Sequence, residues 1–462
     1  MNPWPSRPAL RGALFSLLLI LVPMGTARAQ ESPVNVVAGG LINPQGVAFG
    51  SDGKIYIAEA GTGGDPLTSV PSPDIPFIGG PTGALVRIDD GCPTTIVSGL
   101  ASARATTGET RGPDAVAIIG DRSFALVAGG GSGHGNPDAP AAVIETTGNG
   151  NVPIADLGAW MQANPVAHPP ESGVEPDGAW SALAPAPDGK SLIAVESNSG
   201  QVIRISLDGS IGRLADLSED NQTPTALAVS VDGMINVATF SPPPYASGSA
   251  KVIQIAPDGS ISDLWTGLTM AVGLAIGPDG SLYAAEFSEV RTEPPYFVPG
   301  TGRIIHQTGP DTLEEVVTQV NFPGGITFGP DDALYALVST TGADNGSGQI
   351  IRIDTGTGQP IALNDVDLTP PPCSAGPTAA IVKVSDYGFD PASLTVAAGS
   401  TVTWRVVGEL PHAVASDPSS PMQWDSGVLY GGQEFNLTFD TPGTFSYFDG
   451  LYPDRTAEII VQ

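Results

Sequence analysis

Apolar and polar positions recur in the same order six times along the chain. Each copy has a short apolar run, a turn rich in Gly and Asp, and a second apolar run, as in GVAFGSDGKIYIAEA at 46–60. Such runs favour β-strands, and Asp-Gly supplies the positive φ that a tight hairpin needs. A second hairpin of the same kind follows most copies, as at 251–265. Four strands per repeat and few helical patterns predict an all-β fold that begins with a six-bladed β-propeller.

The sixth repeat leaves its outer strand open to two assignments. The segment VNVVAGGL at 34–41 has the pattern of an outer strand and would complete the repeat beside GQIIRIDTG at 348–356. The segment PIALNDV at 360–366 could fill the same place. Both alternatives close the repeat array, and the pattern alone does not choose between them.

The pattern changes after residue 366. Residues 367–378 are rich in proline, which predicts a stiff, extended linker. From 379 to 462 the strands become longer and alternate regularly between apolar and polar residues, which predicts a small Greek-key β-sandwich. We therefore expect a propeller over 33–366, a linker over 367–378 and a second domain over 379–462.

The first residues have the features of a secretory signal. Arg7 and Arg11 precede an apolar run at 13–22, and Ala27-Arg28-Ala29 offers a cleavage site between small residues. We expect a signal peptide over 1–29, cleaved after Ala29, and a secreted or periplasmic mature protein. The apolar run is too short to span a bilayer, so no membrane span is predicted.

The charge is strongly acidic, with 18 Lys and Arg against 48 Asp and Glu and a formal net charge of −30. Such a field repels nucleic acids, which we exclude as partners. The chain has two cysteines, Cys92 and Cys373. Cys92 falls in a hairpin turn of the first repeat and Cys373 lies just beyond the sixth, and these repeats are neighbours in a closed propeller. Export permits a disulfide, so we predict that these two cysteines pair.

The long connections fall on one face of the predicted propeller. The turns between first and second strands are short, whereas the connections between second and third strands and between repeats are long. The long segments are 61–83, 101–113, 129–141, 151–178, 241–249 and 288–300. Long loops on a rigid scaffold commonly carry binding sites, so we place function on this face.

Glutamates end the second strand of alternate repeats, at Glu59, Glu196 and Glu286. Three such carboxylates could converge near the central channel, bind calcium or another divalent cation, or act in acid–base chemistry. Alternatively, each could cap a strand end or pair with a nearby Arg. Arg111, in a long crossing, is suited to capture of a carboxylate or phosphate, or could neutralise Glu59. We take these four residues as the candidate ligand-binding set.

Histidines and motifs add little to the case for catalysis. His134 lies in the glycine-rich segment GGGSGHGNPD, where a surface position is expected. No HExxH, CxxC, GxSxG or phosphate-binding glycine loop is present in the sequence. These observations favour binding over catalysis, and no catalytic residue is assigned.

The first two repeats resemble a known family. GVAFGSDGKIYIAEAGTGGD, followed by GETRGPDAVAIIGDRSFALVAGGG, is similar to the ScyD/ScyE family of secreted propellers. The similarity covers about 33–366 and becomes loose around Glu175-Pro176-Asp177-Gly178. The family's molecular role is not established, so the resemblance implies a fold and export rather than an activity.

The C-terminal stretch resembles a cupredoxin. DYGFDPASLTVAAGSTVTW, PHAV and DTPGTFSYF match strands and turns of that family, and His412 occupies the position of the first copper-ligating histidine. The other ligand positions of a type 1 site, Cys, His and Met, correspond to Asp449, Tyr452 and Arg455. Without a thiolate the resemblance implies no blue copper centre. A weak metal site from His412 and Asp449 remains as an alternative.

The sequence therefore predicts an exported binding or scaffold protein, whose ligand is a small molecule, a glycan or a protein. The alternative is a metal-dependent hydrolase or lactonase that uses the propeller carboxylates. Copper electron transfer is disfavoured by the missing ligands. We expect no resident cofactor, with calcium possible and copper disfavoured.

Overall fold

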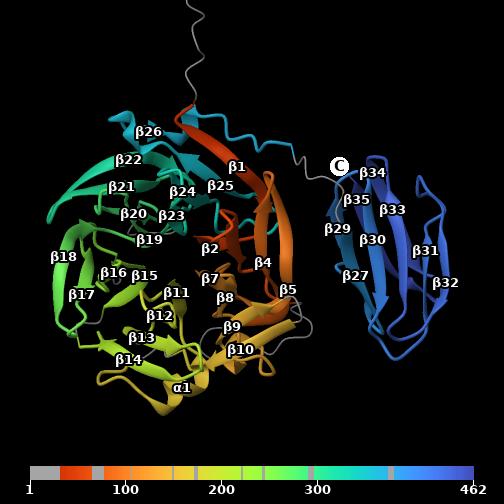
Figure 1. Ribbon diagram of the computed structural model, residues 1–462, viewed down its shortest axis with the longest axis horizontal. Helices are drawn as coiled ribbons and strands as arrows, with labels where there is room; N and C mark the ends of the chain where they lie inside the picture. The colour runs from red at the N-terminus through yellow and green to blue at the C-terminus, as the bar shows by residue number, and fades with distance from the viewer. Residues whose placement is uncertain are drawn as a thin grey trace, which may run out of the picture. The chain divides into compact units, whose positions relative to one another are not determined.

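The computed structural model describes residues 32–64, 77–105, 107–147, 150–170, 175–219, 222–241, 245–289, 296–372 and 379–461 (Figure 1). The predicted signal peptide, residues 1–29, lies outside this set. The described residues are nearly all in β-strands and turns, and the α-helix found among them is α1 (Leu157–Ala163), capped by the Asp156 carboxylate. No helix in the described part is long and apolar enough to cross a membrane.

Residues 33–366 form six sheets, which we call the six-sheet domain. The first is β2 (Pro44–Phe49), β3 (Ile55–Glu59), β4 (Phe77–Asp89), β5 (Cys92–Ala105) and β6 (Thr110–Arg111). The second is β7 (Pro113–Ile119), β8 (Arg122–Val127), β9 (Ala142–Thr147) and β10 (Gly150–Asp156). The third is β11 (Trp180–Pro185), β12 (Ser191–Glu196), β13 (Gln201–Ser206) and β14 (Ile211–Asp216).

The remaining three sheets continue in the same order along the chain. The fourth is β15 (Thr223–Val229), β16 (Ile235–Phe240), β17 (Ala250–Ile255) and β18 (Ile261–Leu268). The fifth is β19 (Ala271–Ile276), β20 (Leu282–Glu286), β21 (Gly302–Gly309), β22 (Thr312–Val320) and β26 (Ile361–Ala362). The sixth is β23 (Ile326–Phe328), β24 (Leu334–Val338), β25 (Gly348–Ile353) and β1 (Val34–Leu41).

The sixth sheet is completed from the start of the domain. β1 pairs antiparallel with β25, with Val34 opposite Ile353. The competing segment instead forms β26, which adds to the fifth sheet by parallel pairing with β22. The first of the two sequence alternatives therefore holds, and the two ends of the domain are joined by backbone hydrogen bonds.

Apolar side chains fill the space between neighbouring sheets. The first strands contact one another in the order β2, β7, β11, β15, β19 and β23, and β23 also contacts β2. One cluster joins Phe124 of the second sheet to Leu192 of the third, and another joins Leu337 of the sixth to Ile57 of the first. Figure 1 shows the six sheets around a common centre. Each sheet thus buries both faces against its neighbours.

The Asp-Gly segments form hairpin turns, as expected, but in the first turn only the glycine has a positive φ. In the first, Gly53 has φ 73° while Asp52 is not among the residues with positive φ. The Asp52 carboxylate accepts a hydrogen bond from the amide of Lys54 at 3.0 Å. The side chain therefore stabilises a right-handed conformation at Asp, and only the glycine adopts the left-handed one.

The long connections lie at one end of the sheets. Because successive strands run antiparallel, the connections β3–β4, β5–β7, β8–β9, β10–β11, β16–β17, β20–β21 and β22–β23 all lie opposite the Asp-Gly turns. We call this end the long-loop face. It is the face on which the sequence placed function.

Residues 379–461 form a sandwich of two sheets, which we call the C-terminal sandwich. One sheet is β28 (Gly388–Asp390), β27 (Ala379–Ser385), β30 (Ser400–Val406) and β33 (Glu434–Phe439). The other is β29 (Ser393–Val396), β35 (Tyr452–Val461), β34 (Gly443–Asp449), β31 (His412–Ser416) and β32 (Asp425–Leu429). Trp404, Phe439 and Tyr447 lie in its core.

Candidate functional site

The three glutamates that end β3, β12 and β20 make the same contact in their own sheets. Each accepts a hydrogen bond from a backbone amide just before the first strand of that sheet. The donors are Ile42 for Glu59 at 2.9 Å, Ala179 for Glu196 at 2.8 Å and Thr269 for Glu286 at 2.7 Å. All three side chains are buried. Their shared role is to fasten the chain entering each sheet to the end of its second strand.

The second carboxylate oxygen distinguishes the three glutamates. Glu286 binds Arg303 through Nε at 2.6 Å, and Glu196 accepts the amide of Ser199 at 2.8 Å. Glu59 has the Ile42 amide as its partner, and burial raises its pKa to about 7, although that hydrogen bond acts in the opposite direction. Glu59 is therefore a carboxyl group that holds a proton near neutral pH.

Of the two roles considered for these glutamates, the contacts of the described residues match the one in which each caps or pairs within its own sheet. Among the described residues, which include Glu59, Glu196 and Glu286, no group of three or more His, Cys, Asp or Glu side chains is arranged to hold a metal ion. The physical reason is that each carboxylate is turned into its own sheet by the amide it accepts.

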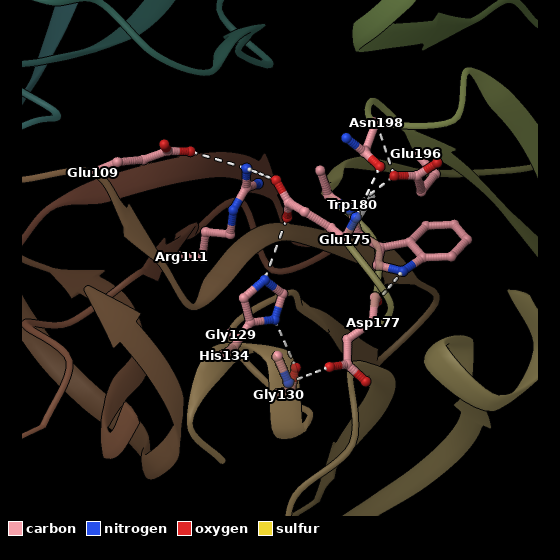
Figure 2. Close-up of polar contacts among 12 residues, drawn as sticks. Glu109, Arg111, Gly129, Gly130, His134, Glu175, Asp177, Trp180, Glu196 and Asn198 are labelled. Carbon is pink, nitrogen blue, oxygen red and sulfur yellow. Dashed lines mark hydrogen bonds and ion pairs between the residues drawn. The ribbon is translucent and has the colours of Figure 1, made fainter. Parts of the chain in front are cut away.

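Arg111 lies at the centre of a different cluster on the long-loop face (Figure 2). Its Nη2 atom is 3.0 Å from Oε1 of Glu109 and 3.0 Å from Oε1 of Glu175. Glu109 and Arg111 belong to the β5–β7 connection, whereas Glu175 belongs to the β10–β11 connection. Burial lowers the pKa of Arg111, but the two carboxylates outweigh it and raise the pKa overall. The expected alternative partner of Arg111, Glu59, is not its partner here.

His134 joins this cluster and is not a surface residue as expected. Its side chain is 2% exposed, and its ring packs edge-on against Phe77 at 4.9 Å. Nδ1 is 2.8 Å from the Gly130 carbonyl, and Nε2 is 3.4 Å from Oε2 of Glu175 (Figure 2). Burial raises the pKa of Glu175, yet Arg111 and His134 outweigh it and lower that pKa, so Glu175 is ionised. Each ring nitrogen of His134 thus faces an acceptor, the Gly130 carbonyl or the Glu175 carboxylate.

A remote carboxylate anchors the loop that carries His134. Asp177 accepts the amide of Gly133 at 2.7 Å, and its own carbonyl accepts the indole N–H of Trp180 at 3.0 Å. Gly131 has φ 100°, and a Cβ there would lie 2.0 Å from the Asp177 carboxyl carbon. The glycine-rich sequence thus permits close approach of two connections that are far apart along the chain.

Two further features lie beside Arg111. Asp114, the second residue of β7, accepts a hydrogen bond from the Gly112 amide at 3.0 Å. Burial raises the Asp114 pKa to about 7 even though Arg111 opposes the shift. The Nε atom of Arg111 is buried and has no hydrogen-bond partner among the described residues. The cluster therefore combines a donor without a partner, a carboxyl whose pKa is raised to about 7, and two further acidic side chains, Glu109 and Glu175.

Sequence reasoning identified Arg111 but not Glu109, Asp114, Glu175 or Asp177. The available signal was local: Glu109 is two residues from Arg111, and Glu175-Pro176-Asp177-Gly178 is the stretch at which the similarity to the ScyD/ScyE family weakens. Which connections meet in space is not encoded in that spacing. The structure brings Arg111 together with residues of two other connections.

The C-terminal sandwich holds a second buried histidine. His412 is fully buried, with Nδ1 2.7 Å from Oδ2 of Asp449 and Nε2 3.3 Å from Oδ1 of Asp386. Asp449 also accepts the amides of Ala413 at 3.1 Å and Leu451 at 3.0 Å. Asp386 accepts the amides of Leu410 and Glu409, which with His412 lower its pKa. Carboxylates therefore engage both nitrogens of the imidazole.

The other former ligand positions complete the same network. Arg455 approaches Asp449 at 3.8 Å, and its guanidinium lies over the Tyr452 ring, 4.0 Å from the ring centre. The Tyr452 ring is 5.7 Å from the His412 ring. The four positions identified from the sequence thus converge, but they supply an ion pair in place of a metal site. Copper does not fit, because the thiolate is absent and both nitrogens of His412 point at carboxylates.

Cys92 is buried and disulfide-bonded. Cys373, its predicted partner, lies outside the described residues, so the pairing itself stays a prediction.

Comparison with known proteins identifies the C-terminal part of the chain. No family model matches the chain. Amicyanin-alpha of Methylorubrum extorquens is 29% identical over 83 residues, covering 18% of this chain and 70% of the amicyanin. Plastocyanin of Scenedesmus fuscus is 34% identical over 68 residues, covering 13% of this chain and 69% of the plastocyanin. This part of the chain, which carries the cupredoxin motifs, belongs to the cupredoxin family that includes plastocyanin and amicyanin.

Solved structures of the same family are also similar to this chain. A purple cupredoxin from Nitrosopumilus maritimus is 22% identical and covers 18% of this chain and 99% of its own, with a TM-score of 0.17. A reduced amicyanin variant is 24% identical and covers 18% of this chain and 82% of its own, with a TM-score of 0.18.

Proposed function

We propose that this is an exported six-bladed β-propeller of the ScyD/ScyE kind that binds a small polar ligand on its long-loop face. The observation that carries the proposal is the meeting of Arg111, His134 and Glu175, which come from three separate long connections. Buried charges are costly unless each is matched, and such clusters on loops are typical of binding sites.

The chemistry of the cluster defines what it could hold. Glu109 is half exposed and Arg111 is 15% exposed, so the cluster is reached from solvent along its Glu109 side. The partly exposed Arg111 guanidinium and the Asp114 carboxyl, whose pKa is raised to about 7, can donate hydrogen bonds, whereas Glu109 and Glu175 can accept them. A ligand with several hydroxyl or amide groups, which both donate and accept, matches this set better than a simple anion.

A metal-dependent hydrolase has less support. That alternative relied on Glu59, Glu196 and Glu286 as a joint cation site, and each is occupied by a backbone amide of its own sheet. The C-terminal sandwich is proposed as a cupredoxin module that keeps the family's fold without type 1 copper, serving in stability or docking.

Ligand-induced stabilisation tests the proposal. The full chain would be melted with a panel of neutral sugars, sugar acids, amino acids and dicarboxylates, because a ligand that binds the folded state raises Tm. We expect one class to raise the Tm of the wild type and of a control, Arg204→Gln, which breaks the exposed ion pair with Asp188. The same class should not stabilise Arg111→Gln or Glu109→Gln.

Glu109→Gln guards against misfolding, since this side chain is 54% exposed. A panel in which no compound raises Tm, or one whose effect persists in both Arg111→Gln and Glu109→Gln, would overturn the proposed site.

A further inference from the structure

Five aromatic side chains form a continuous row across the fourth, fifth and sixth sheets. We define the aromatic row as Phe240, Tyr245, Phe297, Phe287 and Phe322, in order of contact. Neighbouring ring centres are 6.0, 5.7, 5.7 and 4.8 Å apart. The last pair, Phe287 and Phe322, is stacked, and the others meet at steeper angles.

The row lies on the long-loop face. Phe240 is the last residue of β16, Phe287 directly follows β20, and Phe322 lies in the β22–β23 connection. Tyr245 and Phe297 come from the loops that leave β16 and β20. The row therefore occupies the same face as the Arg111 cluster but lies over the fourth, fifth and sixth sheets. Figure 1 labels these sheets by β16, β20 and β23, among others.

These rings do not serve the packing between sheets. In the described part of the chain, none of the five belongs to, or packs against, the hydrophobic clusters that fill the six-sheet domain. Phe49 and Phe328, at the opposite ends of their sheets, do pack against those clusters. All five rings of the row are half-buried, and the adjacent Tyr296 is 47% exposed. The rings contact one another at the surface.

Two residues of the aromatic row have a strained backbone conformation. Tyr245 has φ 61° and Phe322 has φ 39°, a left-handed conformation that bulky side chains rarely adopt. Such strain persists where the surrounding structure enforces it, and it is concentrated at functional sites. The chain thus keeps aromatic residues at two positions whose positive φ only glycine adopts without steric strain.

We propose that the aromatic row is the subsite for a neutral oligosaccharide chain. Aromatic faces stack on the C–H faces of sugar rings, and a row of several rings suits several successive sugars better than one small molecule. The net charge of −30 disfavours anionic polymers. Exposed Glu289 and Asn321 flank Phe287 and Phe322 and can bind hydroxyl groups.

This inference rests on the proposed function, because it assigns a ligand class to the same face. It adds a second contact region to the Arg111 cluster. Polar donors and acceptors then lie on one half of the face and stacking surfaces on the other.

Glycine substitutions test the row without the usual loss of stability. Tyr245→Gly and Phe322→Gly remove a ring and relieve a left-handed φ, so we expect Tm to stay equal or rise. Titration calorimetry of the full chain would use cellohexaose, xylohexaose and maltohexaose, with an alginate hexamer as the anionic control. We expect at least one neutral hexamer to bind, and each substitution to weaken it about tenfold, the size of one aromatic contact.

Phe49→Leu, on the opposite face, is the matched control and should leave the affinity unchanged. The proposal fails if no neutral hexamer binds, if the glycine variants bind as the wild type does, or if they lose Tm as structural rings would. A panel compound that needs Arg111 while no hexamer binds would sink the glycan inference and leave the proposed function standing.

Discussion

The six-sheet domain and the C-terminal sandwich each contain a buried histidine that meets carboxylates and an arginine. In the six-sheet domain, His134, Glu175 and Arg111 come from three connections, and Glu109 extends the cluster to solvent. In the sandwich, His412, Asp449 and Arg455 come from adjacent strands at the position of a copper site. A histidine, a carboxylate and an arginine therefore form a partly exposed cluster in one domain and a buried network at the copper-ligand positions in the other.

The two networks differ in their exposure to solvent: Glu109 is 54% exposed, whereas His412 and Asp449 are 0% and 1% exposed. Asp449 accepts two amides and the imidazole, so it has no oxygen to offer to a ligand. Arg111 retains a donor without a partner among the described residues, and Asp114 beside it holds a proton near neutral pH. Arg455 Nη1 is likewise buried without a hydrogen-bond partner among the described residues, so the exposure of Glu109, rather than an unpaired donor, separates the two networks.

The largest expected effect is the creation of a copper site in the C-terminal sandwich. The triple variant Asp449→Cys, Tyr452→His and Arg455→Met supplies the three missing ligands beside His412. We expect an intense visible thiolate-to-copper band on addition of Cu(II), and no such band in the wild type. Absence of the band in the triple variant would contradict the assignment of these three positions to the copper ligands.

Removal of the sandwich histidine should be the most damaging single substitution. His412→Ala leaves Oδ2 of the buried Asp449 without its nearest hydrogen-bond partner, which costs about 3 kcal/mol. Urea unfolding followed by hydrogen exchange of peptides from 379–461 would measure this loss. A change of only a few tenths of a kcal/mol would mean that the network does not stabilise the sandwich.

Arg111→Gln should lower stability less than His412→Ala does, but it should abolish ligand binding. Glu175 keeps its contact with His134 and donates its own amide to Asn198, so we expect a loss of about 2 kcal/mol in the six-sheet domain. Ligand-induced stabilisation should disappear in the same variant. Calorimetric melting with and without the panel measures both effects, and a purely structural cluster would lower stability while ligand stabilisation remained.

Asp114 in the six-sheet domain and Asp386 in the sandwich should contribute to stability with opposite dependence on pH. The Asp114 pKa is raised to about 7 in the folded state, above its unfolded value of about 4, so its contribution is complete below about pH 4 and is lost as pH rises to about 7. The Asp386 pKa is lowered, so its contribution is present above about pH 4 and is lost on further acidification.

The contrast is tested by measuring Tm of the wild type and of Asp114→Asn from mildly acidic to mildly basic pH. This variant should flatten the pH dependence of the six-sheet domain while that of the sandwich is kept. Asp188→Asn, on the Asp-Gly turns, is the control. Equal pH profiles for wild type and Asp114→Asn would contradict the assigned protonation.

The parts that were predictable from sequence depend on short-range patterns. Asp52-Gly53 and its repeats located the hairpins, because turn chemistry is encoded in adjacent residues. The resemblance to cupredoxins, carried by short motifs, identified His412 and Asp449 as positions of copper ligands. Contacts between residues that are far apart in the sequence were not predictable. Glu59 takes the Ile42 amide rather than joining other glutamates, and His134 is buried by Glu175 and Asp177 from a distant connection.

The aromatic row shows the same limit. Phe240 and Phe287 occupy equivalent places after the second strands of their sheets, a regularity that is present in the sequence. Their contacts through Tyr245 and Phe297 depend on how two loops fold over the surface, and no local spacing encodes that.

Hydrogen exchange of the full chain with each panel compound and each neutral hexamer tests the central claim most directly. The account predicts slower exchange in the connections that carry Arg111, His134 and Glu175, with peptides around His412 and Asp449 unchanged. Protection confined to the sandwich, or no protection with any compound, would contradict the claim that the long-loop face is the binding face.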